Sequence, residues 1–342
     1  MGSGTMFGMT AADVVRRVQD LADTVLFPSA MDVDAADVVP ASHLAALATA
    51  GLYGIAGPIE YGGLAADRTT FCTAVEIMAS GCLATTFVWL QHHGVVRALV
   101  TSPNEDLRSA WLKPLCAGQQ RAGIALGGAR PGPPLLQARR VPGGYLLAGT
   151  SPWVTGWGLV DVLYTLARDQ DGLLVGALLP AQAAATLSAT RLKLVAVNAS
   201  MTVGLTFSGH FVPDELVCSV YPHSQWLATD AEGLRPNGSL SLGVASRCCR
   251  LIGPSPLGDE LALVRARLDT ATTPKLPAAR AAASELVYRA AGAAIVAAGS
   301  RGILAGEHPQ RLAREAQFLM VFGSRPAIKQ CLTEALAASQ PA

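Results

Sequence analysis

The chain has 342 residues, enough to bury a large core in two or three domains. Hydrophobic residues make up 51% of it, charged residues 15%, and the formal net charge is +1. This charge argues against nucleic-acid binding, which needs a concentrated basic face. No uninterrupted apolar stretch looks long enough to cross a bilayer, since residues 290–300 are short and flanked by Arg289 and Arg301. We attribute the apolar excess to alanine-rich helices and subunit interfaces, and expect an oligomer.

The N-terminus and the cysteines favour a cytoplasmic protein. Residues 1–6 lack the basic region and apolar core of a signal peptide, and we expect them to be an appended segment before a natural start near Met6 or Met9. The seven cysteines form no CxxC pair, so free thiols in a reducing cytosol are predicted.

The first third of the chain is predicted to be helical. Apolar residues recur at helical spacing in residues 11–25, 43–52, 70–79 and 85–100. A turn-rich loop, Gly57-Pro58-Ile59-Glu60-Tyr61-Gly62-Gly63, separates the second segment from the third.

The pattern then changes to strands. Apolar runs at 160–167 and 173–179 are joined by a segment that ends in Asp171-Gly172, which predicts a hairpin. A third run, 205–212, ends at Pro213, as strand edges often do.

Helical periodicity returns from about Trp226. Five helices are expected, at residues 238–252, 258–270, 276–299, 309–322 and 326–338. Pro309 and Pro326 both fit the first turn of a helix.

The segment Trp153-Val154-Thr155 is the most informative part of the strand region. Side chains two residues apart on a strand share a face, so the indole and the hydroxyl are expected to point together at one flat ligand. The indole offers a stacking surface and the hydroxyl a hydrogen bond. Plain core packing is the alternative.

This triplet resembles the Trp-Ile-Thr triplet that meets the flavin ring in the acyl-CoA dehydrogenase family. The loop at 57–63 resembles the family's Pro-x-x-Tyr-Gly-Gly segment. The resemblance extends over residues 11–338. It implies an α+β multi-domain fold, with an all-helical N-terminal domain (10–121), a β-barrel-like middle domain (122–220) and a C-terminal helical bundle (226–340).

The resemblance also implies an FAD cofactor. Trp153 and Thr155 would hold its isoalloxazine ring, Leu126 and Gly127 would offer backbone contacts, and Ser324 would lie near the adenosine end. The substrate would be an acyl thioester such as an acyl-CoA, or another lipophilic metabolite. The expected assembly is a homodimer or tetramer.

Both positions at which family members carry the catalytic Glu lack a carboxylate. The Tyr-Glu-Gly-Thr turn corresponds to Val321-Phe322-Gly323-Ser324, in which Phe322 takes the place of the Glu. The second position corresponds to Asn237-Gly238-Ser239-Leu240. Because Phe cannot accept a proton, ordinary α,β-dehydrogenation has no evident base.

Two cofactor-binding segments also differ from the family. The Thr-Glu-Pro-Gly-x-Gly-Ser-Asp loop corresponds to residues 127–134, which lack its hydroxyl and acid but keep backbone amides. The Arg-x-x-Phe-Gly segment has no counterpart between Leu251 and Arg267. Arg130, Arg139 or Arg140 could supply the missing charge, with surface solvation as the alternative.

His92 is our candidate catalytic acid or base, because it lies where flavin-dependent monooxygenases of the superfamily present polar groups to the substrate. The alternative is one buried, hydrogen-bonded His and one solvated His. Metal binding by His92 and His93 is not expected, because adjacent residues on a helix diverge by about 100°. We interpret Arg311 and Glu315 as an i,i+4 structural pair and Trp157 as a packing residue.

Three functions follow from this resemblance. The first is a flavin-dependent oxidoreductase that lacks the usual Glu. The second is a flavin-dependent monooxygenase, which needs no α-proton base. The third is a catalytically silent subunit that pairs with an active acyl-CoA dehydrogenase as a hetero-oligomer. The Trp-x-Thr triplet favours an enzyme, whereas the empty base positions favour the silent subunit.

Overall fold

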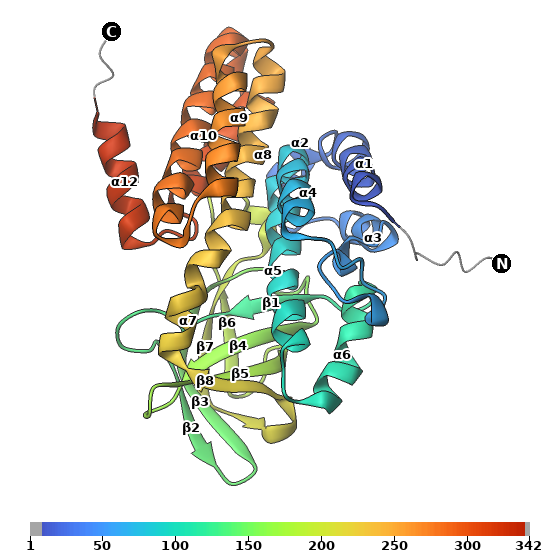
Figure 1. The fold of residues 1–342 in the computed structure, drawn as a ribbon, viewed down its shortest axis with the longest axis vertical. Coiled ribbons are helices and arrows are strands. Elements are labelled where there is room, and N and C mark those ends of the chain that lie inside the picture. Colours follow the sequence, from blue (N-terminus) through green and yellow to red (C-terminus); the bar gives the residue numbers. More distant parts are fainter. Residues whose placement is uncertain (1–8, 339–342) are drawn as a thin grey trace, which may run out of the picture.

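A computed structural model describes residues 9–338, in which helices at both ends of the chain flank one β sheet (Figure 1). This order confirms the expected α+β fold. The four predicted N-terminal helices are confirmed, but the short helix α2 was not expected. Residues 1–8, which include the expected appended segment, lie outside the described part. The elements of the first helical region are α1 (Ala11–Leu21), the π-helical turn η1 (Ala22–Leu26), α2 (Ala30–Ala35), α3 (Ala41–Thr49), α4 (Arg68–Gly81), α5 (Leu83–Val100) and α6 (Glu105–Cys116).

The middle of the chain forms an eight-stranded mixed sheet. Its main path runs β6-β7-β3-β2-β4-β5-β8, and β1 pairs with β4 in parallel. The predicted hairpin is confirmed between β4 and β5, where Gly172 adopts a φ of 79°. The strands are β1 (Ala122–Ala125), β2 (Leu136–Val141), β3 (Gly144–Val154), β4 (Val162–Arg168), β5 (Leu173–Pro180), β6 (Leu187–Arg191), β7 (Val203–Pro213) and β8 (Val217–Pro222).

The C-terminal helices form a bundle above the sheet in Figure 1. All five predicted helices are confirmed, and Pro309 and Pro326 lie in the first turns of theirs. The short helix α7, which connects the sheet to the bundle, was not predicted. The elements are α7 (His223–Thr229), α8 (Leu234–Ile252), α9 (Pro256–Thr270), α10 (Leu276–Ala298), α11 (His308–Val321) and α12 (Pro326–Ala337).

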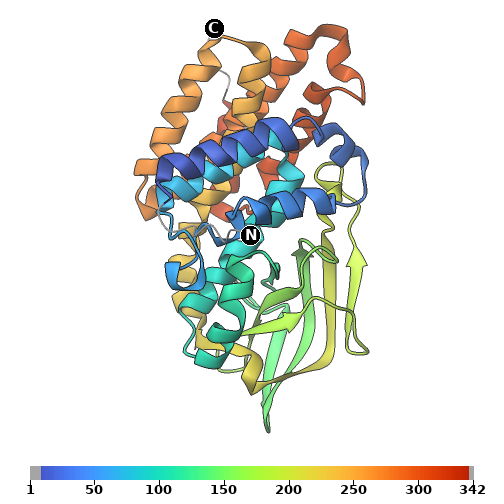
Figure 2. The ribbon, with the colours of Figure 1, turned by 90° about the vertical axis from the view of Figure 1, so that its right-hand side faces the viewer.

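The two helical regions share one hydrophobic core, although they lie far apart in the sequence (Figure 2). Trp89 of α5, Leu240 of α8 and Leu286 of α10 all belong to it. Helix α5 also packs against β1, and its Val95 and Val96 enter a second core on one face of the sheet. Helix α5 therefore connects the bundle to the sheet.

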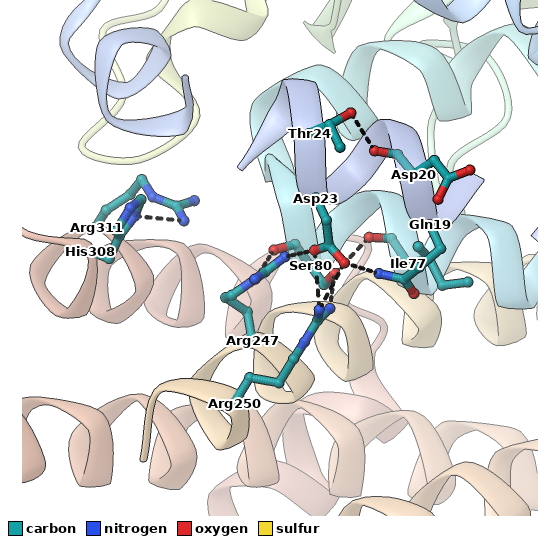
Figure 3. A network of polar contacts seen from close by, with 10 residues as sticks. All are labelled: Gln19, Asp20, Asp23, Thr24, Ile77, Ser80, Arg247, Arg250, His308 and Arg311. Carbon is teal, nitrogen blue, oxygen red and sulfur yellow. Dashed lines mark hydrogen bonds and ion pairs between the residues drawn. The ribbon is translucent and has the colours of Figure 1, made fainter. Parts of the chain in front are cut away.

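A polar network also links the two helical regions (Figure 3). Asp23, in the turn η1, accepts hydrogen bonds from Arg247 at 2.6 Å and from Arg250 at 3.1 Å, both on α8. The guanidinium of Arg247 also lies 3.7 Å from the ring centroid of Phe27. The opposing charges and this cation–π contact hold η1 against α8.

One segment, Thr273–Ile303, is long and apolar enough to cross a membrane by length and composition alone. It is not an uninterrupted apolar stretch, because Arg280, Glu285 and Arg289 lie within it. The segment contains α10, which packs against α8, α9, α11 and α12. Its buried Arg280 donates hydrogen bonds to Ser284 and to the carbonyl of Leu319. These contacts are those of a core helix in a bundle.

Candidate functional site

Trp153 stands out on the surface near the end of β3. Its side chain is 56% exposed, and its backbone has a φ of 62° in the left-handed region. Non-glycine residues seldom adopt this conformation, because Cβ then approaches a backbone carbonyl oxygen. The register of β3 against β7 shifts between Ser151 and Val154, which marks a β-bulge at this point. The bulge turns the indole out of the sheet.

Other residues with an unfavourable backbone conformation lie near Trp153. The described residues contain four non-glycine positions with positive φ, and two of the others, Val197 and Met201, lie in the segment next to this end of β3. Gly156 donates a hydrogen bond to the carbonyl of Ser200 at 2.9 Å, and Trp157 donates one to that of Met201 at 3.1 Å. Such conformations concentrate at ligand sites, where the surrounding structure holds them in place.

Thr155 does not lie on the same face as Trp153, so that expectation was wrong. Its side chain is only 3% exposed, and its hydroxyl lies 3.2 Å from that of Thr202. The Thr202 hydroxyl lies 2.9 Å from that of Ser200. Regular alternation fails because β3 is bulged and ends at Val154. Thr155 begins a buried chain of three hydroxyls that the sequence pattern did not reveal.

Leu126 and Gly127 lie close to the same end of β3. A Cβ at Gly127 would stand 2.4 Å from the carbonyl oxygen of Thr150, so only glycine fits there. Within residues 9–338, no group accepts a hydrogen bond from the amide of Leu126 or Gly127. The structure thus brings two unpaired backbone donors next to Thr150 and Ser151, which precede Trp153 on β3. We call Leu126, Gly127 and Trp153 the platform.

The two positions that lack a catalytic Glu meet in space. The side-chain amide of Asn237 would stand 3.1 Å from a Cβ at Gly323. The ring of Phe322 packs edge-on against Phe87 of α5, at 4.9 Å between centroids. The next residue on α5, Val88, lies beside Gly156, just past the platform strand. Phe322 and Gly156 therefore lie beside adjacent residues of α5.

A buried arginine lies behind this turn. Arg280 donates to the carbonyl oxygens of Leu319 at 3.2 Å and Phe322 at 3.5 Å. Burial lowers its pKa to about 10, and it has no carboxylate partner among the described residues. The place where the family carries its base thus holds apolar groups, an amide and a cation.

Two acidic side chains are buried in the described chain, and each is paired with an arginine. Glu315 accepts a hydrogen bond from Arg311 at 2.6 Å, and Glu76 accepts one from Arg265 at 3.0 Å. The expected Arg311–Glu315 pair is confirmed, and both side chains are buried. Burial raises the pKa of Glu315, and the charge of Arg311 opposes that shift. Neither Glu is free to act as a base.

His92 lies in the core rather than on the platform. Its Nδ1 accepts a hydrogen bond from the amide of Ala122 at 3.2 Å, and its ring packs edge-on against Tyr53. Burial lowers the pKa of His92 to about 3. His93 is also buried, so the expectation of one solvated histidine was wrong. The catalytic role of His92 remains a prediction.

A family model described as "Acyl-CoA dehydrogenase, N-terminal domain" matches residues 10–119. The 2-methylacyl-CoA dehydrogenase of Solanum tuberosum is 27% identical over 176 residues, which are 48% of this chain and 42% of that enzyme. The chain spans about half the length of the curated relatives that it matches.

Solved structures share the fold over nearly the whole chain. Butyryl-CoA dehydrogenase from Megasphaera elsdenii has a TM-score of 0.79 and 17% identity, over 97% of this chain and 100% of that one. The chain therefore has the acyl-CoA dehydrogenase fold, and its residues 10–119 match the N-terminal domain of that family. Another neighbour in this superfamily is a glutaryl-CoA dehydrogenase from Mycobacterium smegmatis in complex with FADH2, with a TM-score of 0.75 and 18% identity, over 98% and 96% of the two chains.

The platform of this acyl-CoA dehydrogenase-like chain fits an isoalloxazine ring. Trp153 offers an exposed flat surface, and the free amides of Leu126 and Gly127 offer donors to ring oxygens or nitrogens. Fewer residues are suited to bind the diphosphate of FAD. Arg140 is paired with Asp214, and Arg265 with Glu76, whereas Arg130 and Arg139 lie exposed at the surface.

Proposed function

We propose that this protein is an FAD-dependent oxidoreductase of the acyl-CoA dehydrogenase type, acting on an acyl thioester or a similar lipophilic metabolite without the usual Glu base. The observation that carries this proposal is the exposed Trp153, held in a left-handed conformation on the strand against which Gly127, one of two residues with unpaired amides, packs. A tryptophan that only packs in the core is expected to have a buried indole and a backbone with negative φ.

The residues of this chain would bind and orient the cofactor. The indole of Trp153 would stack on one face of the ring, and the amides of Leu126 and Gly127 would donate hydrogen bonds to its edge. When bound, FAD supplies two-electron redox chemistry. The absence of a carboxylate at residues 237–240 and 321–324 favours reactions that need no α-proton removal, including oxygenation.

The same absence supports a second candidate function, a catalytically silent subunit. Such a chain would pair with an intact acyl-CoA dehydrogenase and complete its cofactor site. Co-purification of a homologue that carries the Tyr-Glu-Gly-Thr turn, together with lack of FAD uptake by this chain alone, is the result that would favour it.

We also propose a cytoplasmic homo-oligomer. Seven free cysteines support a reducing compartment. Exposed apolar side chains on the C-terminal helices, among them Leu263 and Val296, support a subunit interface. Sedimentation equilibrium would measure the subunit number directly.

The first prediction concerns FAD uptake. The purified protein should show a flavin absorbance band that persists through gel filtration after addition of FAD. Trp153→Ala should weaken FAD binding by about five- to 150-fold, because stacking of an aromatic ring on the cofactor is worth about 1–3 kcal/mol by analogy with base stacking.

The matched control is Phe211→Ala, which removes another exposed aromatic side chain from the same sheet, on β7. It should leave the affinity for FAD unchanged. Wild-type protein that remains colourless would contradict the proposed oxidoreductase. Equal weakening by both variants would show that Trp153 acts only on the stability of the sheet.

A further inference from the structure

The loop between β1 and β2, residues 126–135, is held from outside by two side chains. His223, the first residue of α7, places its Nε2 2.9 Å from the carbonyl oxygen of Ala129. Its Nδ1 lies 2.7 Å from a terminal nitrogen of Arg168. Because a guanidinium only donates, Nδ1 accepts, and the proton must be on Nε2, which donates to the loop.

Arg168, the last residue of β4, holds the loop further along. Its other terminal nitrogen donates to the carbonyl oxygens of Gly132 and, at 3.4 Å, Arg130. The side chain is 9% exposed, so these bonds are shielded from water. Three carbonyl oxygens of the loop therefore accept hydrogen bonds from the guanidinium of Arg168 or from the imidazole of His223, which is itself hydrogen-bonded to Arg168. We call His223 and Arg168 the clamp.

The sequence of the loop explains why it needs the clamp. Pro131, Pro133 and Pro134 have no amide hydrogen, so the loop can close few hydrogen bonds of its own. Its base is fixed by bonds from Leu135 to Gly127 at 3.1 Å and from Gly128 to Leu166 at 2.8 Å. The carbonyls beyond that base would lack protein partners without side chains from other elements.

The clamp has a direct consequence for the platform. In a trans peptide a carbonyl oxygen and the amide hydrogen of the next residue point in opposite directions, so fixing the carbonyl of Ala129 also fixes the amide of Arg130. The clamped carbonyls of Arg130 and Gly132 precede prolines and fix only the path of the loop. Ala129 donates back to the carbonyl of Leu126 at 3.2 Å, and this carbonyl shares its peptide unit with the amide of Gly127.

We propose that His223 and Arg168 are positioning residues of the cofactor site, which hold residues 126–135 so that the amides of Leu126 and Gly127 face the isoalloxazine ring. This inference rests on the proposed function. The imidazole of His223 fixes the position of the first half of the loop through its bond to Ala129. The guanidinium of Arg168 fixes the position of the second half through its bond to Gly132.

The test combines hydrogen exchange of the loop with FAD binding. His223→Ala should speed amide exchange in a peptide covering residues 126–137 by about tenfold without FAD, because hydrogen bonds worth about 1–3 kcal/mol are lost. It should weaken FAD binding by about five- to tenfold. His223→Gln, which can both accept and donate, should recover part of each effect.

The matched control is His210→Ala. His210 is also half-buried in the sheet region, and its Nδ1 lies 2.8 Å from the Thr186 hydroxyl. It should change neither loop exchange nor FAD affinity. If His223→Ala does not fold, Arg168→Lys keeps a cation but cannot reach His223 and both carbonyls together, and the same two measurements apply.

The outcomes separate the inference from the proposed function. If wild-type protein binds FAD and His223→Ala leaves both readouts unchanged, the clamp is wrong and the oxidoreductase stands. Faster exchange with unchanged FAD affinity overturns the positioning role. If wild-type protein binds no FAD, the proposed function fails, and the role of the clamp in the cofactor site fails with it.

Discussion

His92 and His93 illustrate how burial controls single residues in this protein. The two rings lie 5.4 Å apart on α5, and within residues 9–338 neither nitrogen of His93 has a hydrogen-bond partner. Burial lowers the pKa of His92 to about 3 and that of His93 well below its usual value. The unfolded chain therefore binds more protons than the folded one when the pH falls below about 6.5. The stability associated with these neutral rings is present above pH 6.5 and is lost as the pH falls toward their folded pKa values.

The second prediction therefore concerns pH. His93→Leu should leave the free energy of unfolding at pH 7.5 unchanged or slightly raised, because it removes an unsatisfied buried polar ring. It should also reduce the slope of stability against pH below 6.5 by up to about 1.4 kcal/mol per pH unit, the value for one proton. Urea unfolding between pH 4.5 and 7.5 measures both quantities. The control is His210→Leu. It should change the slope less, because His210 is only half-buried. An unaltered slope in His93→Leu would count against this account.

At the scale of elements, α4 and α8 approach closely at a glycine. A Cβ at Gly243 would stand 2.2 Å from the carbonyl oxygen of Glu76 and 2.7 Å from the Cβ of Ala79. Alanine has the higher helix propensity, but the close contact between the two backbones outweighs it here. Gly292 on α10 is exposed and has no atom within 4 Å of the corresponding Cβ position.

The third prediction compares these two glycines. Gly243→Ala should lower the free energy of unfolding by about 1–3 kcal/mol, the usual cost of overpacking. Gly292→Ala should raise it by about 0.5–1 kcal/mol through helix propensity. Urea denaturation of both variants checks the difference in sign. Stabilisation by both substitutions would mean that the α4–α8 contact is looser than described.

At the scale of the whole molecule, the N-terminal helices and the C-terminal bundle are joined through Asp23 (Figure 3). Burial raises the pKa of Asp23, but hydrogen bonds from Arg247 and Gln19 outweigh this effect, so its net pKa is lowered. Arg247 is itself buried, and its Nε donates to the carbonyl oxygen of Ser80 at 2.7 Å. Removing the carboxylate would leave a buried cation without its acidic partner.

The fourth prediction follows from this junction. Asp23→Ala should lower the free energy of unfolding by about 2–4 kcal/mol, because breaking a partly buried ion pair leaves one charge uncompensated. The control is Asp214→Ala, which removes the partner of exposed Arg140. It should cost no more than about 1 kcal/mol, as exposed ion pairs do. Equal costs, measured by urea unfolding, would show that the junction contributes little.

Local patterns in the sequence were sufficient for the order of the elements. Helical spacing placed the long helices, Asp171-Gly172 predicted the turn between β4 and β5, and Pro309 and Pro326 marked helix starts. These features depend on the preferences of neighbouring residues, which a single sequence records. The resemblance around Trp153 likewise predicted the fold that the solved structures share. The two missing carboxylates can also be read from the sequence alone.

Only the tertiary structure decided what those residues contact. The bulge at β3 separated Trp153 from Thr155, and packing between distant helices buried His93 and the Arg311–Glu315 pair. The clamp joins β4, α7 and a loop that lie up to 94 residues apart in the sequence. Burial and side-chain partners depend on which elements meet in space, whereas periodicity reports only how one segment would pack against an unspecified neighbour.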